Sequence, residues 1–141
     1  EKVGGNVIGA LEVPQSETDK YGIITPGTRD GRLTEVVGLV EKPAAGTAPS
    51  NLMIPGRYIL QPEVMKILDN PVTGAGGEIQ LTDAMAHMIG RSRFHAMRYR
   101  GARYDCGNRM GFLEANIAVA LAREDTATEA RAMLARLAKV T

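Results

Sequence analysis

The chain has 141 residues, which is enough for one modest domain with a hydrophobic core but too few for two full domains. Its formal charge of +1 arises from 17 basic and 16 acidic side chains without a long run of either sign, so neither a nucleic acid nor a membrane is expected as partner. The lone Cys106 excludes a disulfide framework and no apolar stretch approaches the ~18 residues that span a bilayer, so a cytoplasmic location is expected.

The first residues, from Glu1 to Asn6, contain neither an initiator methionine nor the pattern of a signal or transit peptide. A natural start after removal of methionine is the alternative, but a methionine that precedes glutamate is usually retained. The sequence therefore predicts that the chain begins inside a longer polypeptide.

The first sixty residues predict strands separated by turns. Val7 to Val13 is a strand-type run closed by Pro14, and Tyr21 to Ile24 is a second one, closed by Pro26 and Gly27. Residues 36–40 are nearly all apolar, which predicts a strand buried on both faces. After a loop over residues 44–51, a further strand is expected through residues 53–54 and 58–60.

The second half has helical periodicity. Pro62 suits the first turn of a short helix, and apolar residues from Leu81 to Ile89 recur at helical spacing before Gly90, a plausible C-cap. Residues 94–99 predict another strand and residues 104–108 a tight turn. Two helices follow, the second of which is expected to begin with a capping box, Thr126-x-x-Glu129. The fold class is therefore α/β with a mixed sheet and C-terminal helices.

Glu41, Lys42 and Pro43 follow the apolar strand at 36–40 directly. Ligands collect at strand ends in α/β sheets, a carboxylate accepts hydrogen bonds from sugar hydroxyls, and an ammonium suits a phosphate. The alternative is a solvated charged turn, which these three residues alone would favour.

Asp105 lies in a glycine-containing turn between a predicted strand and a helix. Mg²⁺ prefers one or two carboxylates together with phosphate and water, so Asp105 is a candidate Mg²⁺ ligand. The alternative is a helix cap, formed by Asp105 or by Asn108.

The segment from Gly74 to Asp83 is rich in glycine and precedes a helix. It lacks the spacing of known phosphate-binding loops, so a loop followed by the start of a helix is the better interpretation.

Five blocks in one order carry a resemblance that runs from about Val7 to the last helix. They are Tyr21-Gly22-Ile23, Val40-Glu41-Lys42-Pro43, Ala48-Pro49-Ser50-Asn51 with Gly56-Arg57-Tyr58, Gly77-Glu78-Ile79-Gln80-Leu81-Thr82-Asp83-Ala84, and Tyr104-Asp105-Cys106-Gly107-Asn108. In this order they resemble the C-terminal half of bacterial UTP–glucose-1-phosphate uridylyltransferases. The Glu-Lys-Pro and Tyr-Gly blocks recur across sugar nucleotidyltransferases, whereas the others are specific to the uridylyl branch.

The resemblance implies a Rossmann-like mixed-sheet sugar nucleotidyltransferase, of which residues 1–141 form the C-terminal, sugar-phosphate-binding part. The family's N-terminal half carries a glycine-rich G-x-G-T-R signature that holds the nucleotide, and a second metal-binding aspartate. Neither has a counterpart in this sequence. The isolated chain is therefore expected to be inactive.

The implied reaction is transfer of UMP from UTP to glucose 1-phosphate, which gives UDP-glucose and pyrophosphate. By resemblance, Glu41 holds glucose hydroxyls, Lys42 the sugar phosphate, and Asp105 the Mg²⁺ cofactor. The backbone N–H of Gly22 approaches the sugar, and Ile54 and Tyr58 line it. The implied partners are UTP and glucose 1-phosphate, and relatives form homo-oligomers.

Two other functions stay open. The sister enzymes that make thymidylyl, adenylyl or guanylyl sugars share the sugar-side blocks. Alternatively, the chain is an inactive piece for sugar-phosphate binding or oligomerisation, since the apolar faces of its last two helices can pack together or form a seam between subunits.

Overall fold

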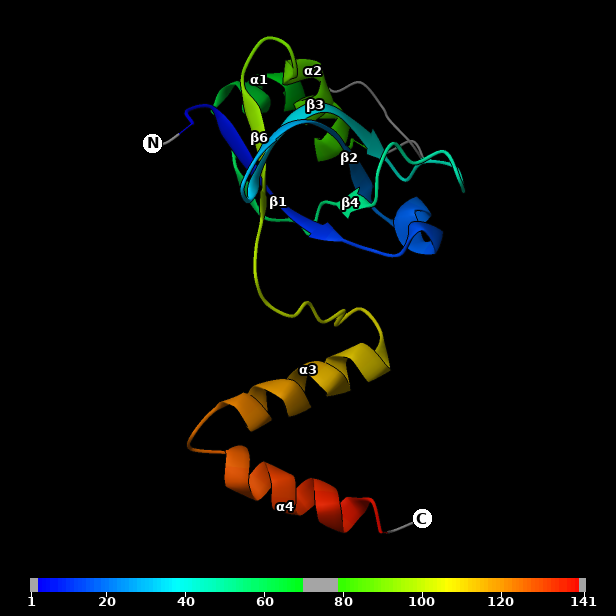
Figure 1. Cartoon of the computed structure of the whole chain (residues 1–141), viewed down its shortest axis with the longest axis vertical. Helices are drawn as coiled ribbons and strands as arrows, with labels where there is room; N and C mark the ends of the chain where they lie inside the picture. The colour runs from blue at the N-terminus through cyan, green and yellow to red at the C-terminus, as the bar shows by residue number, and fades with distance from the viewer. Residues whose placement is uncertain (1–2, 70–78, 140–141) are drawn as a thin grey trace. The chain divides into compact units, whose positions relative to one another are not determined.

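The computed structural model describes residues 3–69 and 79–139 (Figure 1). The chain divides into two compact units, Glu1–Arg100 and Gly101–Thr141, and each is described by itself. The first unit contains β1 (Asn6–Glu12), the 3₁₀ helix η1 (Gln15–Lys20), β2 (Gly22–Asp30), β3 (Leu33–Glu41), β4 (Leu52–Met53), β5 (Tyr58–Ile59), α1 (Glu63–Leu68), α2 (Leu81–Met88) and β6 (Phe94–Arg98). The second unit contains α3 (Arg109–Ala122) and α4 (Ala127–Leu137).

The first unit is built on one mixed sheet with strand order β4-β2-β3-β6-β1-β5. Only β1 and β6 pair in parallel, and the other pairings between described strands are antiparallel. Met53 of β4 pairs with both Leu11 of β1 and Ile23 of β2. The short strand β4, at one end of the strand order, therefore also pairs with β1, the last strand but one at the other end. The predicted α/β class with a mixed sheet is confirmed.

The hydrophobic core lies between the sheet and the helices α1 and α2. Ile8, Ile24 and Val36 supply the sheet side, while Val64 and Met85 supply the helix side, and all five are buried. The predicted C-cap Gly90 is wrong by one residue, because the C-cap of α2 is Ile89, which is extended. Gly90 follows it with φ 87°, a left-handed conformation that favours glycine.

Three further expectations are wrong in detail. The strand at 36–40 is not buried on both faces, because Val37 and Val40 are 49% and 41% exposed. The strand that begins near Gly22 does not stop at Pro26 but continues to Asp30, because its register with β3 shifts on both sides of Pro26 and such an irregularity tolerates a residue without an N–H. Thr126 caps no backbone N–H of α4, and its hydroxyl donates instead to the carbonyl of Ala120 at 2.8 Å.

The second unit is a hairpin in which α3 packs against α4. The hairpin buries Ala130, whereas the larger apolar side chains of Phe112, Val119 and Leu137 are 58%, 54% and 54% exposed. No helix in residues 3–69 or 79–139 is long and apolar enough to cross a membrane.

Candidate functional site

Two neighbouring strand ends place Gly22 directly opposite Glu41. Gly22 begins β2, Glu41 ends β3, and the two residues are cross-strand partners. A Cβ at position 22 would lie 2.9 Å from Glu41 Oε2, closer than real Cβ atoms approach an oxygen. The glycine therefore leaves the space that the Glu41 carboxylate fills. The expected approach of a ligand to the Gly22 N–H stays a prediction.

Thr82, in the first turn of α2, holds the same carboxylate. Its hydroxyl donates a hydrogen bond of 2.7 Å to Glu41 Oε2, and its residue is only 7% exposed. A Cβ at position 22 would also lie 3.3 Å from Thr82 Oγ1. Sequence reasoning missed this residue, although the block from Gln80 to Asp83 that carries the resemblance contains it.

Ile54 joins the same cluster through contacts, and Tyr58 through the charge of Glu41. Ile54 is buried, its N–H donates to the Gly22 carbonyl at 2.9 Å, and its Cδ1 would lie 3.3 Å from a Cβ at position 22. Burial, and to a smaller extent the negative charge of Glu41, raise the pKa of the Tyr58 hydroxyl. Like any tyrosine hydroxyl with a pKa of 10.0 or above, this hydroxyl is protonated at neutral pH and can donate a hydrogen bond.

Lys42 follows with an unusual backbone conformation. Its φ of 44° makes it the one described residue other than glycine with a positive φ, and it precedes Pro43, which further restricts its backbone. Its N–H donates to the carbonyl of Tyr21 at 3.1 Å, while its side chain is exposed. The backbone strain is thus accepted at the residue predicted to meet a phosphate.

Asp105 belongs to the second unit. Its Oδ1 accepts a hydrogen bond from the Gly107 N–H at 3.0 Å, and its carbonyl accepts one from Asn108 Nδ2 at 3.2 Å. Asn108 is the cap of α3, because its Oδ1 accepts a hydrogen bond from the Gly111 N–H at 2.8 Å. Asn108, and not Asp105, is therefore the cap of α3. The Asp105 side chain is exposed, and its second oxygen, Oδ2, makes no hydrogen bond to a described residue.

The donor set for a metal is partial. Residues 3–69 and 79–139 contain no group of three or more His, Cys, Asp or Glu side chains that could hold a metal ion. One exposed carboxylate with a free oxygen nevertheless fits Mg²⁺, which often takes one protein carboxylate and completes its shell with phosphate and water.

Ser50, in the block Ala48-Pro49-Ser50-Asn51, has a structural role. Its hydroxyl donates to the carbonyl of Ile24 at 2.6 Å and accepts from the N–H of Leu52 at 3.0 Å. These two bonds fix the loop before β4 to β2 and thereby help to place Ile54. In the block from Gly77 to Ala84, Gly77 and Glu78 lie outside the described residues, as do Gly74, Ala75 and Gly76 before them.

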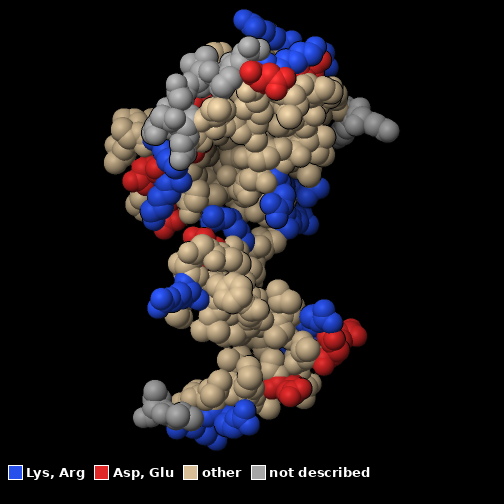
Figure 2. Space-filling model, turned by 180° about the vertical axis from the view of Figure 1, so that it is seen from behind, with Lys and Arg blue, Asp and Glu red and all other residues tan. Residues whose placement is uncertain are grey.

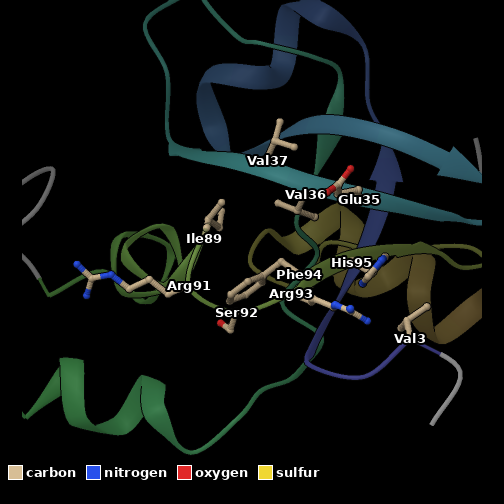
Figure 3. A pocket seen from close by; sticks show the side chains of 11 residues that line it. Val3, Glu35, Val36, Val37, Ile89, Arg91, Ser92, Arg93, Phe94 and His95 are labelled. Atoms are coloured by element: carbon tan, nitrogen blue, oxygen red, sulfur yellow. The ribbon is translucent and has the colours of Figure 1, made fainter.

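A cavity of about 700 Å³ also lies in the first unit (Figure 3). The strands β3 and β6 pair only where Leu33–Glu35 meets His95–Met97, and the cavity opens where this pairing ends. Val37, Arg93 and Phe94 are among its lining residues. None of the six predicted site residues lines it, so the cavity is separate from the cluster around Glu41.

The sequence of the chain matches a known protein family. The family described as nucleotidyl transferase matches residues 3–121. A UTP–glucose-1-phosphate uridylyltransferase of Staphylococcus epidermidis is 44% identical over 137 residues, which cover 97% of this chain and 48% of the relative. One of the same name from Komagataeibacter xylinus is 52% identical over 109 residues, which cover 77% of this chain and 38% of the relative.

Solved structures give the same result. A UDP-glucose pyrophosphorylase in complex with UDP-glucose superimposes with a TM-score of 0.78 at 39% identity, covering 84% of this chain and 45% of that one. A UTP-bound enzyme of the same kind from Acinetobacter baumannii gives a TM-score of 0.82 at 33% identity, covering 96% and 47%. The chain thus spans about half the length of the relatives it matches.

The first prediction concerns the effect of the Glu41 charge on the pKa of Tyr58. Glu41→Gln should lower the pKa of Tyr58, because it removes a negative charge that opposes ionisation of the phenol, whereas burial keeps part of the elevation. Glu35→Gln, on the same strand β3, is the matched control and should leave this pKa unchanged. The measurement is an NMR titration of ¹³C-labelled tyrosine, and an unchanged Tyr58 pKa in Glu41→Gln would contradict this effect.

The strained backbone of Lys42 makes a second prediction. Lys42→Gly should be about 1 kcal/mol more stable than Lys42→Ala, since both remove the side chain but only glycine adopts a positive φ without steric cost. Urea unfolding of both variants measures the difference. An alanine variant at least as stable as the glycine variant would contradict the strained conformation.

Proposed function

The chain belongs to the nucleotidyl transferase family, and from this membership we propose that it forms the sugar-phosphate side of a UTP–glucose-1-phosphate uridylyltransferase. The complete enzyme would transfer UMP from UTP to glucose 1-phosphate in the cytoplasm. The observation that carries the proposal is the Glu41 carboxylate, which Thr82 holds beside Gly22 at two adjoining strand ends.

The chemistry of this cluster suits a sugar phosphate. Glu41 keeps Oε1 for hydroxyl donors, because Thr82 occupies only Oε2. The Tyr58 hydroxyl can donate a hydrogen bond, and Ile54 adds an apolar wall. The adjacent Lys42 offers a positive charge to the phosphate of the same ligand.

The reaction brings two anions together. An oxygen of the glucose 1-phosphate forms a bond to the α-phosphorus of UTP while the bond to pyrophosphate breaks. The protein contributes mainly by positioning the two reactants and by offsetting their charge. In this proposal Glu41 and Tyr58 orient the glucosyl group, and Lys42 lowers the repulsion between the sugar phosphate and the triphosphate.

Asp105 is the residue we assign to Mg²⁺. Its free Oδ2 would be the ligand, while the Gly107 N–H keeps the carboxylate in place through Oδ1. A bound Mg²⁺ would supply charge neutralisation to the phosphates. Nucleotide binding is assigned to polypeptide outside residues 1–141, and residues 1–141 alone are proposed to be inactive.

The helical hairpin is proposed to join copies of the chain. Large apolar side chains remain exposed on both helices although these helices pack against each other, and contiguous exposed apolar patches mark interaction surfaces. Figure 2 shows a broad uncharged surface on this unit between scattered charged side chains.

The kinetic roles give a third prediction. In the complete enzyme, Lys42→Ala and Asp105→Ala should each lower kcat/KM by at least ~100-fold, because Lys42 carries a positive charge that offsets the phosphates in the transition state and Asp105 would hold the Mg²⁺ that does the same. Lys66→Ala and Asp19→Ala, which change exposed residues of the same types, are the controls and should retain normal turnover.

The assay is UTP-dependent formation of UDP-glucose, run beside thymidine, adenosine and guanosine triphosphates. Near-normal turnover in Lys42→Ala or Asp105→Ala would remove that residue from the mechanism. A preference for another triphosphate would instead identify the enzyme as a thymidylyl, adenylyl or guanylyl transferase.

The exposed hairpin gives a fourth prediction. Phe112→Glu combined with Val119→Glu should shift the protein from an oligomer to a monomer, because the two positions are seven residues apart on one face of α3 and a charge there resists burial. The control Arg131→Glu, at an exposed polar position of α4, should leave the protein oligomeric. Light scattering after gel filtration measures the mass, and a wild-type protein that is monomeric at all concentrations would refute the seam.

A further inference from the structure

The hydroxyl of Thr82 bonds to a residue outside its own helix. Threonine in a helix interior commonly bonds to the carbonyl three or four residues earlier, but Thr82 is the second residue of α2 and no turn of this helix precedes it. Here the hydroxyl reaches a carboxylate 41 positions away in the sequence, at 2.7 Å, a normal length for an O–H···O hydrogen bond. Because Thr82 is 7% exposed, water competes little for this bond.

The bond restricts how the carboxylate can turn. Glu41 has three rotatable side-chain bonds, and an exposed glutamate would populate many of their rotamers. With Oε2 fixed to Thr82, and with Gly22 offering the space beside both atoms, the remaining oxygen Oε1 takes a defined direction. A fixed carboxylate can select hydroxyl groups by their position, whereas a mobile one selects only for their presence.

We propose that Thr82 is a positioning residue that holds the Glu41 carboxylate in the orientation that accepts the sugar hydroxyls, and so contributes to the choice of sugar. The proposal rests on the proposed function of Glu41. Thr82 acts through Glu41 and needs no contact with the sugar. Its hydrogen bond also links α2 to the end of β3, in addition to the apolar packing between α2 and the sheet.

The first test compares two substitutions in the complete enzyme. Thr82→Val keeps the shape of the side chain but removes the hydroxyl, whereas Thr82→Ser keeps the hydroxyl. Thr82→Val should raise KM for glucose 1-phosphate by about 10- to 100-fold, the range expected for losing a hydrogen bond to a charged group, with KM for UTP unchanged. Thr82→Ser should restore KM to within about threefold of wild type.

A double-mutant cycle tests whether Thr82 acts through Glu41. In a Glu41→Gln background, Thr82→Val should cause little further loss, because the oriented carboxylate is already gone. Additive losses, or a Thr82→Ser variant as impaired as Thr82→Val, would overturn the proposal. Relative activity with galactose 1-phosphate should rise in Thr82→Val, and an unchanged ratio to glucose 1-phosphate would count against a role in sugar choice.

A readout independent of activity separates this proposal from the proposed function. The pKa of Tyr58 reports where the Glu41 charge lies, so Thr82→Val should change it and Thr82→Ser should not. If this pKa responds as expected but the wild-type enzyme makes no UDP-glucose, the positioning stands and the proposed function fails. If the enzyme is active but neither KM nor this pKa responds to Thr82→Val, the positioning role fails alone.

Discussion

The register between β2 and β3 controls the site, because it sets Gly22 against Glu41 at the ends of both strands. Side chains alternate along a strand, so a slip of one residue would turn the Glu41 carboxylate to the opposite face of the sheet and put a side chain where the glycine is needed. Thr82 then adds a contact from outside the sheet, since its hydroxyl bonds to Glu41 Oε2 at 2.7 Å. Strand pairing places the carboxylate, the missing side chain at position 22 makes room for it, and the helix fixes its direction. The remaining residues of the cluster depend on this arrangement.

At Lys42, the residue after Glu41, the requirements of stability and of the proposed phosphate binding differ. Lys42 is exposed and adopts φ 44°, so the fold gains no burial from its side chain and accepts strain in its backbone. Glycine would relieve that strain but would remove the ammonium. The Tyr21 carbonyl, which accepts from the Lys42 N–H, and the buried Pro43 hold the backbone on either side. The proposed role of Lys42 in binding the sugar phosphate would account for a cation kept at this strained position.

Strand ends, turns and apolar periodicity are local signals, and from them the sequence predicted most elements. The five predicted residues in the cluster or beside it came instead from the resemblance to a family. Sequence reasoning failed where the outcome depends on contacts between distant segments. Pro26 was expected to end a strand, but irregular pairing with β3 lets β2 pass it. Thr126 has the spacing of a capping box, yet its hydroxyl bonds to α3. The role of Thr82 was not predictable because its partner lies 41 residues away and is reached only after the sheet and α2 have packed. The resemblance included its block without indicating its contact.

The cluster around Glu41 is formed by elements of the first unit alone. Gly22, Glu41, Ile54, Tyr58 and Thr82 come from β2, β3, the segment after β4, β5 and α2, and β4 ties β1 to β2 through Met53. The bonds of Ser50 hold the loop before β4 against β2, and the N–H of Ile54 holds the segment after β4 against the same strand. Orientation of the carboxylate is therefore a property of this unit, whereas charge neutralisation also involves Asp105, which lies in the second unit. In the proposed enzyme, sugar recognition is therefore assigned to the first unit, whereas charge neutralisation is shared between Lys42 in the first unit and Asp105 in the second.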